Sequence, residues 1–255
     1  MSGARSILKI AYRLLGAAAQ FNGNPLPYVV TLRRFLVEYG AFGGMEKNGN
    51  FELSPANLYP CLRDWTTHTP LEPVYFHQDT WAAGKLAKLK PEHHYDVGSS
   101  AMTIGILAQF FPVTMVDIRP LDLRLDNLFF REGSILALPF PDDSVASLSS
   151  LCVVEHIGLG RYGDPLDPWG SEKAIAELKR VLKPGGDLLV SVPVDAVCRV
   201  YFNAHRAFTR QYLLECFKGL ELREERYIYG RELLGDYDPA SGFGTGLFHL
   251  AKVSR

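Results

Sequence analysis

The chain has 255 residues, and its 27 basic and 28 acidic side chains nearly cancel, so no global field favours nucleic acid or another polyanion. This length suits one large domain, or one domain with an extension, and allows a substantial core. The four cysteines, Cys61, Cys152, Cys198 and Cys216, form no Cys-x-x-Cys pair, which favours reduced thiols in a cytoplasmic protein. No apolar run reaches the roughly 18 to 20 residues that a membrane-spanning helix needs.

The first 73 residues are predicted to form a helical extension before an α/β domain over residues 74–255. Residues 6–19 place apolar side chains at helical spacing with interleaved basic residues, which is typical of an amphipathic helix on a membrane surface, on a partner protein or on its own domain. Lys9 and Arg13 interrupt the apolar run that a signal peptide needs. A turn at residues 22–27 and a second helix through residues 29–39 follow. This helix is predicted to end at Gly43-Gly44, before irregular chain.

Residues 94–119 predict half of a nucleotide-binding α/β unit. A short strand ends at Asp96, a small-residue turn begins at Gly98, and a helix leads to a second strand that is closed by Asp117. Such a turn lets backbone N–H groups approach a ligand, and the second acid can bind a ribose diol. Ser100 and Met102 replace further glycines, which argues against a tightly bound pyrophosphate and hence against NAD or FAD. S-adenosylmethionine has no phosphate and demands less of the turn. A turn without a ligand is the alternative.

The remaining pattern predicts strands alternating with helices. A helix over residues 80–89 precedes the first strand, Ser171 is a candidate N-cap of a helix that Pro184-Gly185-Gly186 ends, and Thr209 caps a further helix. The later strands are expected at residues 128–132, 145–153, 187–194, 220–229 and 246–253. Five alternating strands and two terminal ones give a seven-stranded, Rossmann-like α/β sheet.

Several motifs over residues 94–194 together resemble the class I S-adenosylmethionine-dependent methyltransferases. They are Asp96-Val97-Gly98-Ser99-Ser100, Asp117, Leu138-Pro139-Phe140-Pro141-Asp142, Glu155-His156-Ile157 and Arg180-Val181-Leu182-Lys183-Pro184-Gly185-Gly186. The run Glu-His-Ile-Gly-Leu-Gly-Arg-Tyr-Gly-Asp-Pro at residues 155–165, with Phe-Asn-Ala-His-Arg at 202–206, is similar to an uncharacterised methyltransferase-like family often associated with surface-glycan biosynthesis. This similarity extends from about Phe35 to the C-terminus.

The resemblance implies a set of roles toward S-adenosylmethionine. Gly98, Ser99 and Ser100 would bind its methionyl part, and Asp96 would orient this turn and the ligand's ammonium group through water. The remaining roles implied are ribose binding by Asp117, adenine packing by Ile118, contact with the adenine edge by Ser134 and Ile135, and backbone contact with the methionine amine by Leu151 and Cys152. The family often has an acid at the position of Ser134, so the serine makes a weaker contact.

Methyl transfer to a hydroxyl group needs orientation and a base. His156 is the best candidate because it follows the central strand and its ordinary pKa lies near 6.5. His205 follows the fifth strand, and Asp164 in the loop between could orient a histidine, bind sugar hydroxyls or ligate a divalent metal. The alternatives are that His156 is a structural histidine, that His205 and Arg206 form a helix-capping and salt-bridge pair, and that Asp164 belongs to a solvated loop. No dedicated metal site is expected.

The predicted function is S-adenosylmethionine-dependent methylation of a small-molecule or glycan acceptor at oxygen, and the glycan part rests on the resemblance alone. The alternative is a catalytically inactive scaffold, if Ser100 and Met102 narrow the cofactor pocket. An NAD-dependent oxidoreductase is disfavoured by the missing glycines. Nucleic acid is not an expected partner because the chain has no basic stripe and no Asn/Asp-Pro-Pro-Tyr/Phe motif.

Overall fold

The computed structural model describes residues 12, 16, 25–45 and 49–254. The chain divides into two compact units, Met1–Pro70 and Leu71–Arg255. The predicted boundary, after residue 73, lies close to this division. The amphipathic helix predicted at residues 6–19 lies outside the described residues, so its contact with a membrane or a partner stays a prediction. Within the described part of the chain, no helix has the length and apolarity needed to cross a membrane.

The first unit contains α2 (Pro25–Gly43) and the short 3-10 helix η1 (Pro55–Asn57). The predicted end of α2 is confirmed, and the Gly44 N–H closes the last turn by donating to the Gly40 carbonyl. The predicted turn at residues 22–27 is wrong in its second half, because Pro25 already begins the helix. A proline is tolerated there, since the first turn of a helix has no internal acceptor for its N–H groups.

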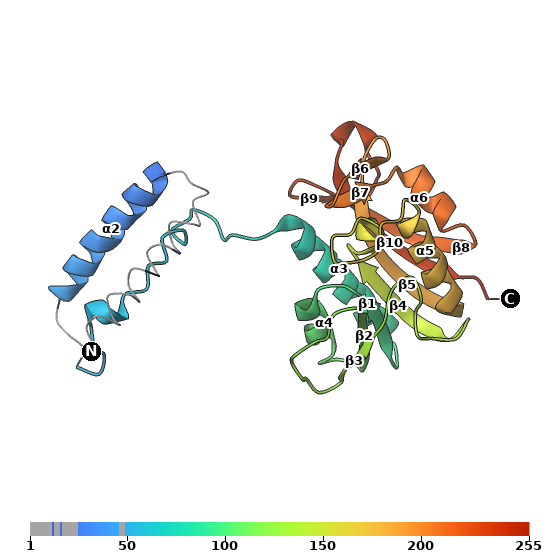
Figure 1. Cartoon of the computed structure of the whole chain (residues 1–255), viewed down its shortest axis with the longest axis horizontal. Helices are drawn as coiled ribbons and strands as arrows, with labels where there is room; N and C mark the ends of the chain where they lie inside the picture. The colour runs from blue at the N-terminus through green and yellow to red at the C-terminus, as the bar shows by residue number, and fades with distance from the viewer. Residues whose placement is uncertain (1–11, 13–15, 17–24, 46–48, 255) are drawn as a thin grey trace. The chain divides into compact units, whose positions relative to one another are not determined.

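The second unit is built on an eight-stranded mixed sheet in the order β3-β2-β1-β4-β5-β10-β8-β9 (Figure 1). Its first five strands in sequence pair in parallel, and β10 and β8 close the sheet in antiparallel pairing. The bounds are β1 (His94–Val97), β2 (Val113–Asp117), β3 (Leu128–Glu132), β4 (Val145–Leu151), β5 (Leu182–Val194), β8 (Leu220–Tyr229), β9 (Glu232–Leu234) and β10 (Gly244–Lys252). All seven predicted strands are therefore present, which confirms the Rossmann-like α/β fold class.

Helices cover both faces of this sheet because its strands are apolar on both sides. On one face, α3 (Pro73–Leu89) and α4 (Ala101–Leu107) pack with Met115, Leu151 and Leu189. On the other face, α5 (Gly170–Val181) and α6 (Arg210–Cys216) pack with a larger apolar cluster that includes Leu148 and Val190. Strand neighbours such as Leu189 and Val190 point to opposite faces, as the period of two requires.

The structure departs from the predicted elements at a few places. The eighth strand, β9, is a short hairpin partner of β8, and a separate hairpin joins β6 (Arg199–Tyr201) to β7 (His205–Ala207). Helix α3 begins at Pro73, before the predicted residue 80, because Glu72 caps it. Ser171 is not an N-cap: α5 begins at Gly170, and the buried Ser171 Oγ donates to the Val154 carbonyl at 2.8 Å. Thr209 caps α6 as predicted.

Candidate active site

Two adjoining cavities lie in the second unit where the parallel strands β1, β2 and β4 end. Their volumes are about 1130 and 390 Å³. The carboxyl ends of parallel strands meet at one edge of a sheet, which is where α/β proteins bind ligands. The residues that line both cavities are Gly98, Asp117, Arg119, Cys152, His156 and Tyr162.

The turn after β1 is built around Gly98. Its φ of +72° lies in the left-handed region, and a Cβ there would stand 3.0 Å from Val153 Cγ1. The Gly98 N–H donates to the Val116 carbonyl at 2.9 Å, which ties the turn to β2. Ser99 and Ser100, the other predicted turn residues, line the larger cavity. This turn therefore needs glycine at one position and presents its next two residues to the cavity.

Asp96 supports this turn from the protein interior. It is fully buried and lines neither cavity. Its carboxylate accepts hydrogen bonds from the Ser99 N–H at 3.0 Å, the Ser99 Oγ at 2.6 Å and the Ser149 Oγ at 2.5 Å. Ser149 in turn pairs with His94 Nε2 at 2.9 Å. Burial raises the Asp96 pKa to about 6, against the opposing effect of the serine hydrogen bonds. The structure thus places Asp96 as the support of the turn, with no direct access to a ligand.

Asp117 ends β2 at the junction of the two cavities. Its carboxylate accepts from the Arg119 N–H at 2.8 Å and from the Arg119 Nε and Nη2 at 3.2 Å each. The Arg119 guanidinium also lies 4.8 Å from the ring centroid of Tyr162, within the range of a cation–π contact. Asp117 is therefore held in an ion pair with Arg119, whose side chain is exposed. The sequence pattern had assigned no role to Arg119, whereas Tyr162 was a candidate for stacking on a carbohydrate acceptor.

The smaller cavity receives the side chains predicted to surround adenine. Ile118, Ser134 and Ile135 all line it. Ile135 is buried, whereas Ile118 is largely exposed at the end of β2. The Ser134 Oγ accepts from the Leu136 N–H at 3.2 Å, so it stabilises its own turn. The cavity is thus apolar on two sides, as a flat aromatic ring requires.

Leu151 and Cys152 end β4 beside the turn. The Leu151 N–H donates to the Ser99 Oγ at 2.9 Å, and the Cys152 N–H donates to the Ser191 carbonyl at 3.0 Å. The N–H groups of both residues are therefore paired within the protein. Cys152 has a φ of +53°, which is rare outside glycine, and this conformation ends the strand two residues earlier than predicted.

His156 lies at the end of the 3-10 helix η2 (Val154–His156) and lines both cavities. Its Nδ1 donates to the Ala204 carbonyl at 2.6 Å, which leaves Nε2 without a proton on the neutral ring. Burial lowers the His156 pKa to about 4, with only partial compensation from that carbonyl. This pKa lies below the unperturbed value near 6.5. His156 is neutral at pH 7, oriented by its backbone partner, and able to accept a hydrogen bond at Nε2.

The other two predicted catalytic residues lie at different walls. His205 lines the larger cavity, where its ring stands between Tyr201 at 5.1 Å and Phe243 at 5.4 Å, and burial lowers its pKa. Asp164 lines the smaller cavity, and its carboxylate accepts from the N–H groups of Gly158 at 2.6 Å, Gly160 at 3.4 Å and Tyr162 at 3.3 Å. Asp164 thus organises the loop that carries Tyr162.

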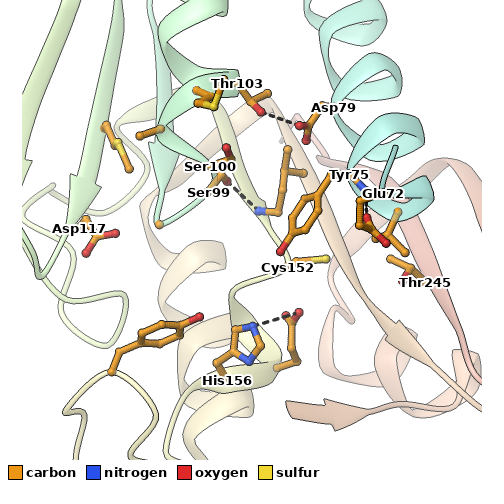
Figure 2. Close-up of a pocket in the computed structure, with 18 of the residues that line it drawn as sticks. Glu72, Tyr75, Asp79, Ser99, Ser100, Thr103, Asp117, Cys152, His156 and Thr245 are labelled. Atoms are coloured by element: carbon orange, nitrogen blue, oxygen red, sulfur yellow. Dashed lines mark hydrogen bonds and ion pairs between the residues drawn. The ribbon is translucent and has the colours of Figure 1, made fainter. Parts of the chain in front are cut away.

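Helix α3 supplies cavity residues that the sequence analysis did not identify. Figure 2 shows Tyr75 pointing towards Cys152 and Asp79 beside Thr103, whereas Glu72, the N-cap of α3, lies beside Thr245. Asp79 accepts from the Thr103 Oγ at 2.6 Å, which joins α3 to α4. The only sequence signal was the spacing of Tyr75 and Asp79, four residues apart on one helix face. It could not reveal which part of the sheet that face covers.

Glu155 is a further cavity residue to which the sequence pattern had assigned no role. It lines the larger cavity and is only 2% exposed. Its Oε1 lies 3.7 Å from His156 Nε2. Burial raises the Glu155 pKa to about 8, so the group is mostly protonated at pH 7. Its position next to the predicted base was visible in the sequence, but its burial was not.

Comparison with known proteins places this fold among methyltransferases. A family model described as Caenorhabditis protein of unknown function, DUF268, matches residues 139–227, which is less than half of the chain. A Mycolicibacterium smegmatis protein described as a probable S-adenosylmethionine-dependent methyltransferase is 34% identical over 70 residues, or 28% of this chain. The chain spans only 23% of the length of that curated relative.

Solved structures extend the similarity over most of the chain. The Burkholderia thailandensis 1,6-didemethyltoxoflavin-N1-methyltransferase has a TM-score of 0.53 at 17% identity, covering 91% of this chain and 92% of its own. The [4+2]-cyclase SpnF has a TM-score of 0.53 at 15% identity, covering 69% and 82%. The geranyl diphosphate C-methyltransferase of Streptomyces coelicolor has a TM-score of 0.51 at 13% identity, covering 68% and 78%.

The fold is thus that of the class I S-adenosylmethionine-dependent methyltransferase superfamily. The family model that matches residues 139–227 is described as being of unknown function and covers less than half of the chain, so it defines no narrower family. At these identities the likeness of the solved structures concerns the fold, and SpnF illustrates that one fold hosts several chemistries.

Proposed function

We propose that the protein is an S-adenosylmethionine-dependent methyltransferase that methylates a small-molecule or glycan acceptor at oxygen. The observation that carries this proposal is the convergence of the Gly98 turn, Asp117 and His156 around two adjoining cavities at the ends of β1, β2 and β4. The description of the M. smegmatis relative supports the activity. The B. thailandensis enzyme, which has a similar fold, binds S-adenosylhomocysteine together with 1,6-didemethyltoxoflavin.

The residues present fit S-adenosylmethionine. Asp117 offers carboxylate oxygens at the junction of the cavities, where a ribose diol could replace the Arg119 guanidinium. Ile118 and Ile135 offer apolar walls for adenine. The larger cavity, at about 1130 Å³, exceeds the roughly 300–1,000 Å³ of typical ligand pockets, so it has room for the methionyl part and an acceptor.

The bound cofactor would supply an activated methyl group on a sulfonium centre. His156 would act on the acceptor, because it lines the larger cavity and keeps a free Nε2 lone pair while Nδ1 is held by the Ala204 carbonyl. A hydroxyl group that hydrogen-bonds to Nε2 is oriented and can pass its proton there as the new C–O bond forms. The low pKa of His156 makes it a weak base that carries the proton only briefly.

The structure also bears on the inactive alternative, which assumed that Ser100 and Met102 fill the cofactor pocket. Both residues line the larger cavity, yet Met102 is 80% exposed and points largely to solvent. With Ser100 and Met102 in place, the larger cavity has a volume of about 1130 Å³. This geometry supports the catalytic interpretation over the scaffold.

Calorimetric titration with S-adenosylmethionine and S-adenosylhomocysteine tests the proposal. The wild-type protein should bind both, and Asp117→Ala should weaken both by about 10- to 100-fold, the effect of losing hydrogen bonds to a charged group. Asp122→Ala is the matched control, because Asp122 is an exposed acid on the same connection and lines neither cavity. No binding to folded wild-type protein would refute the proposal.

A screen with methyl-labelled cofactor then identifies the acceptor. Sugars and lipid-linked glycans form one arm, and small hydroxylated aromatic compounds form the other. Label in an ether product supports oxygen methylation. Label found only on nitrogen or carbon would refute the assignment of the methylated atom while leaving the activity in place.

A further inference from the structure

The Glu155 carboxyl has an oxygen that the rest of the described chain leaves without a partner. Its Oε2 is buried and accepts no hydrogen bond from any described residue. The side chain is 2% exposed and lines the larger cavity. Buried polar atoms nearly always have a hydrogen-bond partner, so an unpaired oxygen at a cavity wall indicates that a group of the ligand pairs with it.

The groups around Glu155 do not supply that partner. His156 Nε2 lies 3.7 Å from Oε1, which is beyond hydrogen-bond distance and leaves Oε2 without a partner. The Cys152 thiol also interacts with the Glu155 carboxyl, but it donates its one proton to Gln78 Oε1 at 2.9 Å. The other titratable or charged side chains that line the larger cavity are Glu72, Tyr75, Asp79, Asp117, Arg119, Cys152, His156, Arg161, Tyr162 and His205.

We propose that Glu155 is a cation-binding carboxylate, which makes the larger cavity prefer a positively charged ligand to an uncharged ligand of the same shape. A buried carboxyl without a partner stays protonated in the empty cavity, because the charged form is poorly solvated there. A cation that enters the cavity favours the charged form, and the carboxyl proton passes to solvent. The products are a carboxylate paired with the bound cation and one released proton, so charge and atoms balance.

This inference rests on the proposed function, because the pair of ligands that tests it is the cofactor S-adenosylmethionine and its product S-adenosylhomocysteine. S-adenosylmethionine and S-adenosylhomocysteine differ by one methyl group and by the positive charge on sulfur, and both carry the same amine, carboxylate and adenosine. If Glu155 faces the cationic centre, it lets the site distinguish substrate from product by charge. A methyl acceptor that carries a positively charged group is the second ligand that could supply the cation paired with Glu155.

Calorimetry at pH 7 in two buffers of different ionisation enthalpy measures the protons released on binding. The wild-type protein should release up to about one proton more with S-adenosylmethionine than with S-adenosylhomocysteine. In Glu155→Gln this difference should vanish, and the preference for the charged ligand should fall by about tenfold or more. Glu72→Gln is the matched control, because Glu72 lines the same cavity but is exposed and already accepts from the Tyr75 N–H.

The outcomes separate this inference from the proposed function. Equal proton release with both ligands, or an unchanged charge preference in Glu155→Gln, would overturn the role of Glu155 toward the cofactor while leaving cofactor binding intact. If a cationic acceptor is the true source, the extra proton appears only when an amine-bearing acceptor is added to the S-adenosylhomocysteine complex. Absence of that proton as well overturns the inference.

A further measurement covers the case in which neither ligand binds, or in which Glu155→Gln does not fold. The Glu155 carboxyl is followed by carbon NMR of wild-type protein during a pH titration, with and without trimethylsulfonium chloride. A lower midpoint in the presence of this small cation supports the inference. An unchanged midpoint overturns it, whatever the fate of the proposed function.

Discussion

The buried Glu155 carboxyl should make the protein less stable as the pH rises, and Glu155→Gln should abolish that loss. The Glu155 pKa is about 8 in the folded protein, against 4.5 for an exposed glutamate. Between these values the folded state binds more protons than the unfolded state, so the free energy of unfolding falls with rising pH. The slope approaches about 1.36 kcal/mol per pH unit, so the wild-type protein should lose about 3 kcal/mol from this group between about pH 5 and pH 7.5.

The glutamine side chain of the variant cannot ionise, so the variant's stability should not contain this loss. A buried amide adds a cost of about 1–3 kcal/mol, but this offset is the same at every pH and cancels from the slope. Urea unfolding followed by far-UV circular dichroism at several pH values, without ligand, gives the difference between the two proteins. The difference should change by about 3 kcal/mol in favour of the variant over this range. Parallel curves for wild type and variant would refute the reasoning, and Glu72→Gln should run parallel to wild type.

Three further predictions concern the turn, the base and the loop. Gly98→Ala should destabilise the protein by about 1–3 kcal/mol in thermal unfolding, because alanine is strained at a φ of +72° and its Cβ meets Val153. The control Gly84→Ala, in α3 with open space around the position, should instead stabilise the protein by up to about 1 kcal/mol. His156→Asn should keep cofactor affinity in calorimetry and reduce turnover by about 10²- to 10⁴-fold; full turnover would return His156 to a structural role. Asp164→Ala leaves three backbone N–H groups of its loop unpaired, so limited proteolysis should cut at residues 158–165 faster than in wild type, and equal cutting rates would contradict the loop-organising role.

The sequence alone was enough for the fold and for much of the candidate site. Strand and helix periods are local, and parallel strands bring their carboxyl ends to one edge. Residues that directly follow a predicted strand, such as Gly98, Asp117 and His156, therefore had to lie near one another. The short strand β9 and the early start of α3 were missed, because each depends on a hairpin partner or a cap that the apolar pattern does not reveal.

Only the tertiary structure decided which side chains at this edge are exposed to a ligand and in which charge state. Asp96 was predicted to orient the turn and, through water, the ligand's ammonium group. Packing buries it under the turn, where Ser99 and Ser149 from different elements donate hydrogen bonds to its carboxylate. Glu155 and His156 are neighbours in sequence, and burial moves the pKa of the first up and of the second down. Burial depends on segments far apart in the chain, such as α3 and β7, so no local pattern carries this information.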